Sequence, residues 1–149
     1  MKPIRLHIKY DAQDGYLYGG RLFLICNDGA IKSIPLWKII STNLEEYTNE
    51  YYLFKLAFDR NNWLTNNQSD AFLGIGGLKK EFQKVWKRVA GIDYRFTIKE
   101  EDLTVLSKVK RMPVFDFRLY GMRMFIGDRT GLYEAGLSIN GDSDVSLNE

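Results

Sequence analysis

The feature that most constrains this chain is an internal match between two segments that lie far apart in the sequence. Residues 14–33 align with residues 116–135 without a gap, and seven of the twenty aligned positions are identical. The identical pairs are Asp14 and Asp116, Leu17 and Leu119, Tyr18 and Tyr120, Gly19 and Gly121, Arg21 and Arg123, Phe23 and Phe125, and Gly29 and Gly131. Chance would give roughly one or two identities in such a window, so the match predicts a repeated structural unit.

Each copy has the pattern of three short antiparallel strands. The expected strands cover residues 16–18, 21–26 and 30–34 in the first copy, and 114–120, 123–126 and 132–137 in the second. Gly19 and Gly20 favour a two-residue hairpin turn, because such turns need positive φ angles. The pattern therefore predicts a three-strand meander in both copies, with Phe23 and Phe125 at equivalent inward positions.

The order of an apolar strand, Tyr-Gly-x-Arg, an apolar-Phe-apolar triplet and a second glycine, in residues 14–35 and 114–137, resembles the blade repeat of β-propellers. This resemblance implies a mainly β fold of repeated antiparallel three-strand meanders, which the helix expected over 78–90 interrupts as a helical insertion. A weaker third copy is expected in residues 54–78, because Ala71-Phe72-Leu73-Gly74 resembles Met124-Phe125-Ile126-Gly127. A propeller needs four or more blades. The chain is therefore expected to be the N-terminal part of a larger propeller, to complete a ring with another chain, or to be a compact α+β domain. In the last case the two meanders pair in one sheet, which a helix covers.

The remaining elements follow from hydrophobic periodicity, and we expect one domain over residues 1–149. Alternation over residues 4–9 predicts a half-buried strand, and an apolar stripe predicts a helix over about 78–90 that ends at Gly91. Thr42 and Glu45 resemble a capping box, from which we expect a helix to Tyr52 and then a strand over 54–58. Strands are expected over 92–98 and 103–109, around the acidic turn 100–102, and the polar tail 140–149 is expected to be loosely held.

Composition excludes several classes of function. The chain has one cysteine, Cys26, and one histidine, His7, so an intrachain disulfide and a zinc site of the usual kind are both excluded. We find no catalytic constellation, and we expect neither enzymatic activity nor a cofactor. The N-terminus lacks the continuous apolar segment of a signal peptide and no stretch of 18 apolar residues exists, so we expect a cytoplasmic protein.

The first functional hypothesis is a non-enzymatic protein–protein interaction or scaffold module. Its meanders would form a rigid platform, and loops at 59–71 and 126–131 would carry contacts to a protein partner or to the remainder of a larger propeller. Tyrosine and tryptophan dominate the hot spots of protein interfaces. The candidate anchors are therefore Tyr47, Tyr51, Tyr52 and Trp63.

The alternative hypothesis is a nucleic-acid-binding or regulatory domain that uses the helix at 78–90. Residues 79–123 hold twelve basic and six acidic side chains, whereas the net charge of the whole chain is only +2. The polar face of the helix carries five of these cations, Lys79, Lys80, Lys84, Lys87 and Arg88. A basic stripe of this kind is the pattern expected for contacts to a phosphate backbone.

Overall fold

In a computed structural model, the chain divides into two compact units, and each unit draws on two separate stretches of the sequence. The structure describes residues 2–58, 74, 77–108, 113–140 and 144–148. Unit 1 comprises Met1–Tyr10 and Leu36–Ile98, and unit 2 comprises Asp11–Pro35 and Lys99–Glu149. Over the described residues the fold is mainly β with helical parts, and no closed barrel or propeller is formed.

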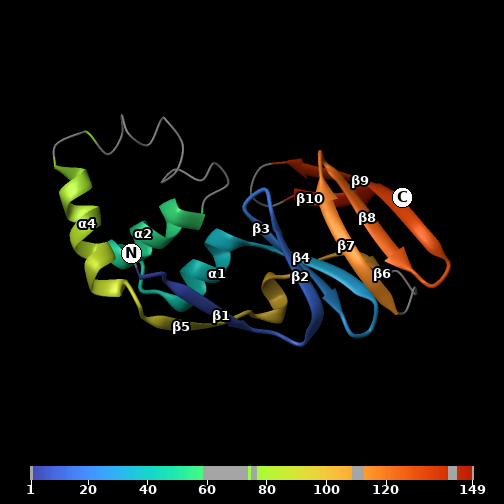
Figure 1. The fold of residues 1–149 in the computed structure, drawn as a ribbon, viewed down its shortest axis with the longest axis horizontal. Coiled ribbons are helices and arrows are strands. Elements are labelled where there is room, and N and C mark those ends of the chain that lie inside the picture. The colour runs from blue at the N-terminus through green and yellow to red at the C-terminus, as the bar shows by residue number, and fades with distance from the viewer. Residues whose placement is uncertain (1, 59–73, 75–76, 109–112, 141–143, 149) are drawn as a thin grey trace. The chain divides into compact units, whose positions relative to one another are not determined.

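Over its described residues, unit 2 contains two four-stranded antiparallel sheets (Figure 1). The first sheet has the order β2-β3-β4-β6, with bounds Ala12–Tyr18, Arg21–Cys26, Ala30–Pro35 and Thr104–Lys108. The second sheet has the order β7-β8-β9-β10, with bounds Val114–Tyr120, Arg123–Asp128, Gly131–Asn140 and Asp144–Asn148. Both predicted meanders are confirmed, but they lie in separate sheets. The expectation that they pair in one sheet under a helix is therefore wrong.

The two meanders share the register of their first hairpin residue for residue. Tyr18 pairs with Arg21 in the first copy, and Tyr120 pairs with Arg123 in the second. Both copies have a register shift at the same aligned place, between Ala12 and Asp14 and between Val114 and Asp116. The turns also match, because Gly19 and Gly20 have φ angles of 56° and 74°, and Gly121 and Met122 have 56° and 60°. The sequence match thus reflects a repeated conformation.

The two sheets of unit 2 bury a common core, but they contribute opposite faces of the repeat to it. The first sheet supplies Phe23, Ile25 and Ile31, whereas the second supplies Met124 and Ile126 from β8, one of its two inner strands. Side chains alternate between the two faces of a strand. Phe125 therefore lies on the other face of the second sheet, where it is only partly buried, while Phe23 is fully buried. The prediction of equivalent inward positions is wrong for Phe125.

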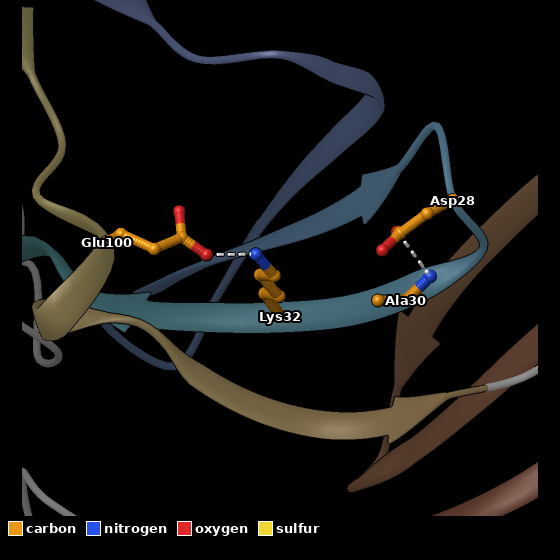
Figure 2. A network of polar contacts seen from close by, with 4 residues as sticks. All are labelled: Asp28, Ala30, Lys32 and Glu100. Carbon is orange, nitrogen blue, oxygen red and sulfur yellow. Dashed lines mark hydrogen bonds and ion pairs between the residues drawn. The ribbon is translucent and has the colours of Figure 1, made fainter.

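Polar contacts fix the turn before β4 and join β4 to the segment that precedes β6 (Figure 2). Lys32 on β4 pairs with Glu100, which belongs to the 3₁₀ helix η1 (Glu100–Asp102) at the predicted acidic turn. In the turn before β4, the Asp28 carboxylate accepts a hydrogen bond of 3.0 Å from the Ala30 amide. Such Asp-to-backbone bonds favour turns over continued strand. The segment that leads into β6 is thereby fixed beside β4.

In the part of unit 1 that the structure describes, three helices pack against a two-stranded parallel sheet. Its elements are β1 (Arg5–Lys9), α1 (Leu36–Asn43), α2 (Asn49–Phe58), α4 (Leu78–Val89) and β5 (Asp93–Thr97), and β1 pairs with β5. The predicted strand over 4–9 and helix over 78–90 are confirmed. Gly91, with φ of 85°, follows the end of α4 as expected, and its amide donates to the Pro3 carbonyl at 3.1 Å.

Three sequence-based expectations about local structure are wrong. Residues 54–58 belong to helix α2 and do not form a strand. The helix buries Leu53 and Phe54 in the core of unit 1. That helix starts after Thr48, whose hydroxyl accepts the Tyr51 amide at 3.1 Å, so Thr42 is not its cap. The polar tail includes β10, which pairs with β9.

The two ends of the expected third copy, residues 54–58 and 78, lie in the helices α2 and α4, so they do not form strands of a meander. Most of the third copy between these ends, and the loop at 59–71, lie outside the described residues. None of the described helices is both long and apolar enough to cross a membrane.

Candidate functional site

Charge separates between the two units. By sequence, unit 1 holds twelve basic and seven acidic side chains, a net charge of +5, whereas unit 2 holds nine basic and twelve acidic, a net charge of −3. The small net charge of the chain therefore hides a strongly basic unit. Because a clustered basic surface raises the local concentration of anions, unit 1 is the place to look for an anion-binding site.

Helix α4 carries the densest group of these cations. Val85 and Val89 are buried with Leu53 of α2, and Phe82 and Trp86 pack partly against this cluster. The opposite side of α4 is exposed and presents its five cations, Lys79, Lys80, Lys84, Lys87 and Arg88. The helix is thus anchored by its apolar side, and all five predicted basic residues lie on its solvent side.

Three of the lysines form a straight stripe. Lys80, Lys84 and Lys87 have the spacing i, i+4, i+7, which places them on one line along the helix. At a rise of about 1.5 Å per residue, the stripe is about 10 Å long. This length allows contact with several consecutive phosphates of a nucleic-acid strand, which follow one another at about 3.4 Å along the axis of B-form DNA.

Ion pairs divide the five cations into two groups. Lys84 pairs with Glu81 within the helix at 2.7 Å, and Arg88 pairs with Glu50 of α2 at 3.4 Å. Over the part of the chain that the structure describes, Lys79, Lys80 and Lys87 have no acidic partner. These three ammonium groups are the ones available to an anionic ligand without the loss of an existing pair.

Arg88 has a structural role beside Tyr94. Burial raises the pKa of the Tyr94 hydroxyl above its ordinary value of 10.0, and the Glu50 carboxylate raises it further, whereas the Arg88 guanidinium lowers it. Arg88 and Glu50 are thus electrostatically coupled to the Tyr94 hydroxyl on β5. We therefore assign the ligand-facing role to the lysines.

The predicted aromatic anchors that the structure describes differ in their exposure to solvent. Tyr51 is buried, with its hydroxyl 3.2 Å from the Ser41 hydroxyl, so its assignment as an exposed anchor is wrong. Tyr52 and Tyr47 are exposed, with 45% and 80% of their surface accessible. Trp63 lies outside the described residues. In the loop 126–131 of unit 2, Ile126 belongs to the core, and the other residues form the end of β8, the turn after it and the start of β9.

No family model, curated protein or solved structure matches this chain.

Unit 1 has a second basic surface, on β1 and β5, which the sequence patterns did not predict. The exposed side chains of β1 are Arg5, His7 and Lys9, and Arg95 of β5 lies directly beside His7 in the parallel register. One carboxylate, Asp93, lies 3.7 Å from both Arg5 and His7. The alternation on β1 was visible in the sequence, but its pairing with a strand so distant in the chain was not.

The described residues contain no group of three or more side chains suited to bind a metal ion. In unit 2, Asp14 and Asp116, the aligned aspartates of the repeat, line a cavity of about 110 Å³. Ligand pockets usually measure about 300–1,000 Å³. One carboxylate accepts the Gly15 amide at 2.7 Å and the other pairs with Arg118 at 3.3 Å, so both are used within the fold.

Proposed function

We propose that this chain is a non-enzymatic binding module whose helix α4 binds the phosphate backbone of a nucleic acid. The observation that carries this proposal is the exposed stripe of Lys80, Lys84 and Lys87 in a unit of net charge +5. Contacts to phosphate supply most of the affinity in sequence-independent binding. The proposal concerns backbone contacts only, because nothing in the stripe resembles the side chains that identify a base.

The loss of one predicted anchor favours this function over the interaction module that was the first hypothesis. A protein interface is expected to centre on exposed aromatic residues. In unit 1, Tyr51 is used inside the fold, whereas every predicted cation of α4 is exposed. The electrostatic hypothesis therefore keeps all of its residues, and the aromatic one does not.

The test is a binding titration with charge-reversed chains. A fluorescein-labelled 20-nucleotide single strand and a 20-base-pair duplex are titrated with the chain, and anisotropy gives the affinity at several salt concentrations. Each phosphate contact adds about one to the slope of log affinity against log salt. We expect Lys80→Glu, Lys84→Glu and Lys87→Glu together to lower the affinity at least tenfold and to reduce the slope by about two to three.

A matched control separates the helix from total charge. Lys99→Glu, Arg118→Glu and Arg129→Glu change the net charge by the same amount at exposed positions of unit 2. We expect this variant to bind nearly as tightly as the original chain. Equal losses in both variants would show that only net charge matters, and absence of salt-dependent binding by the original chain would reject the proposal.

A further inference from the structure

The basic surface on β1 and β5 is one continuous face of the strand pair. Residues that are paired in register, and residues two apart on a strand, point to the same side of a sheet. We define the β1/β5 face by the six exposed side chains on this side, Arg5, His7, Lys9, Asp93, Arg95 and Thr97. With the histidine neutral, three cations and one carboxylate give this face a net charge of +2.

The opposite face of the same strand pair belongs to the core of unit 1. Phe96 is buried, and the rings of Tyr94 and Phe96 lie 4.9 Å and 6.1 Å from the ring of Phe54 on α2. Parallel strands are usually covered on both faces. In the part of the chain that the structure describes, the β1/β5 face instead stays exposed and charged, which suits a binding surface better than a packing surface.

The cations of the β1/β5 face are weakly held by the protein. The Asp93 carboxylate lies 3.7 Å from both Arg5 and His7, whose side chains are 66% and 58% exposed. Exposed pairs of this kind contribute little to stability. Among the described residues, Lys9 and Arg95 have no acidic partner. An anionic ligand can therefore contact this face without breaking a strong ion pair.

The β1/β5 face continues from the end of helix α4. The helix runs directly into β5, beside which β1 lies, and the Arg5 amide donates to the Ile92 carbonyl at 3.5 Å (Figure 1). The exposed Lys2 lies over Gly91, its Cδ 3.2 Å from the place that a Cβ would take there. Lys2 thus connects the last turn of α4, which carries Lys87, to the first cation of β1.

The spacing of the cations suits a repeating polyanion. Arg5, His7 and Lys9 follow one another at about 6.6 Å, since a strand rises about 3.3 Å per residue. This spacing is about two nucleotide steps of 3.4 Å along a B-form strand. An added peptide strand would need the free backbone groups at the edge of β5. The Asn43 side chain already bonds both the amide and the carbonyl of Thr97, at 2.8 Å and 2.9 Å.

We propose that the β1/β5 face binds further phosphates of the same nucleic-acid strand that α4 contacts, with Lys2 between the two surfaces. Arg5, Lys9 and Arg95 contact the phosphates, whereas the Asp93 carboxylate repels them and holds the affinity down. This inference rests on the proposed function, since it takes the same ligand. It extends the site from one helix to a path across unit 1.

The experiment compares a loss and a gain of charge on the β1/β5 face, by anisotropy with the labelled 20-nucleotide single strand at several salt concentrations. Arg5→Gln, Lys9→Gln and Arg95→Gln together should lower the affinity at least fivefold and reduce the salt slope by about two, the value for three contacts to a single strand. Asp93→Asn should raise the affinity by about two- to fourfold. A gain of affinity cannot result from a damaged fold.

Matched variants of unit 2 control for net charge. Lys99→Gln, Arg118→Gln and Arg129→Gln together, and Asp116→Asn alone, change exposed side chains and shift the charge equally. We expect the affinity of both controls to stay close to that of the original chain. Losses and gains as large as those of the β1/β5 variants would overturn the inference, because only net charge would then matter.

The variants of α4 separate this inference from the proposed function. If charge reversal of Lys80, Lys84 and Lys87 weakens binding but no β1/β5 variant changes it, the inference is wrong and the α4 proposal stands. If only the β1/β5 variants change binding, the α4 proposal is wrong and the sheet is the site. A labelled poly-glutamate peptide of 20 residues that binds as tightly, and responds equally to Asp93→Asn, would overturn the inference in favour of an acidic protein.

Discussion

Replacing the same aligned residue in the two meanders should have unequal effects on stability. Phe23 is fully buried between the two sheets, whereas Phe125 is partly buried on the outer face of one sheet. Removing a buried phenylalanine costs about 3–5 kcal/mol, because burial is lost and a cavity remains. At Phe125 water fills the vacated space, so only part of the transfer free energy is lost, about 1–2 kcal/mol.

We therefore expect Phe23→Ala to lower the free energy of unfolding by about 2–3 kcal/mol more than Phe125→Ala. Urea denaturation followed by far-ultraviolet circular dichroism measures both values. Hydrogen exchange of the β3 and β8 amides then assigns each loss to unit 2. Equal losses in the two variants would refute the opposite-face arrangement of the repeat, because they would place both rings in the same surroundings.

Two further predictions concern a turn and a titrating group. Met122 has a φ of 60° where the first copy has Gly20. Met122→Gly should therefore raise the free energy of unfolding by about 0.5–1 kcal/mol in urea denaturation. An unchanged free energy of unfolding in this variant, together with no loss of stability in Gly20→Met, would contradict the expectation. The raised pKa of Tyr94 means that the unfolded chain loses this proton first, so stability should fall as the pH rises from about 10 towards the pKa of the folded state. Tyr94→Phe should remove that part of the fall between pH 9 and 11, and an unchanged pH profile would argue against a buried hydroxyl.

Local patterns predicted the strands of both meanders, because alternation and glycine turns act over a few residues. They could not predict which face of each strand would be covered. Phe23 and Phe125 both lie between two apolar residues and have the same register in the first hairpin of their meanders, yet their burial differs. Burial depends on the layer that packs on each sheet, and that layer comes from elsewhere in the chain.

Residues 54–58 show the same limit within one element. Phe54, Leu56 and Phe58 alternate as in a strand, but the structure places them in helix α2. The Phe54 ring packs edge to face on Tyr94 of β5, with ring centroids 4.9 Å apart, and lies beside the Phe58 ring, with centroids 6.1 Å apart. The alternation over these five residues is equally compatible with either period. Tertiary contacts with β5 decided the outcome.

The candidate site was predictable where it depended on one helix. The amphipathic pattern of α4 places its lysines on the solvent side regardless of what covers the other side. Tyr51 could not be assigned in this way, since it is buried where α2 packs on α1, with its hydroxyl 3.2 Å from that of Ser41. The basic surface of β1 and β5 depends on a parallel pairing between distant segments, which no local pattern specifies.

The most direct test of the functional account is to map the ligand onto the chain by nuclear magnetic resonance. A ¹⁵N-labelled chain is titrated with the 20-nucleotide strand at low salt, and amide shift changes are recorded for each residue. The account predicts that the largest changes cluster at Lys80, Lys84 and Lys87 and disappear at high salt. Changes confined to unit 2, or none on α4 at saturation, would contradict it.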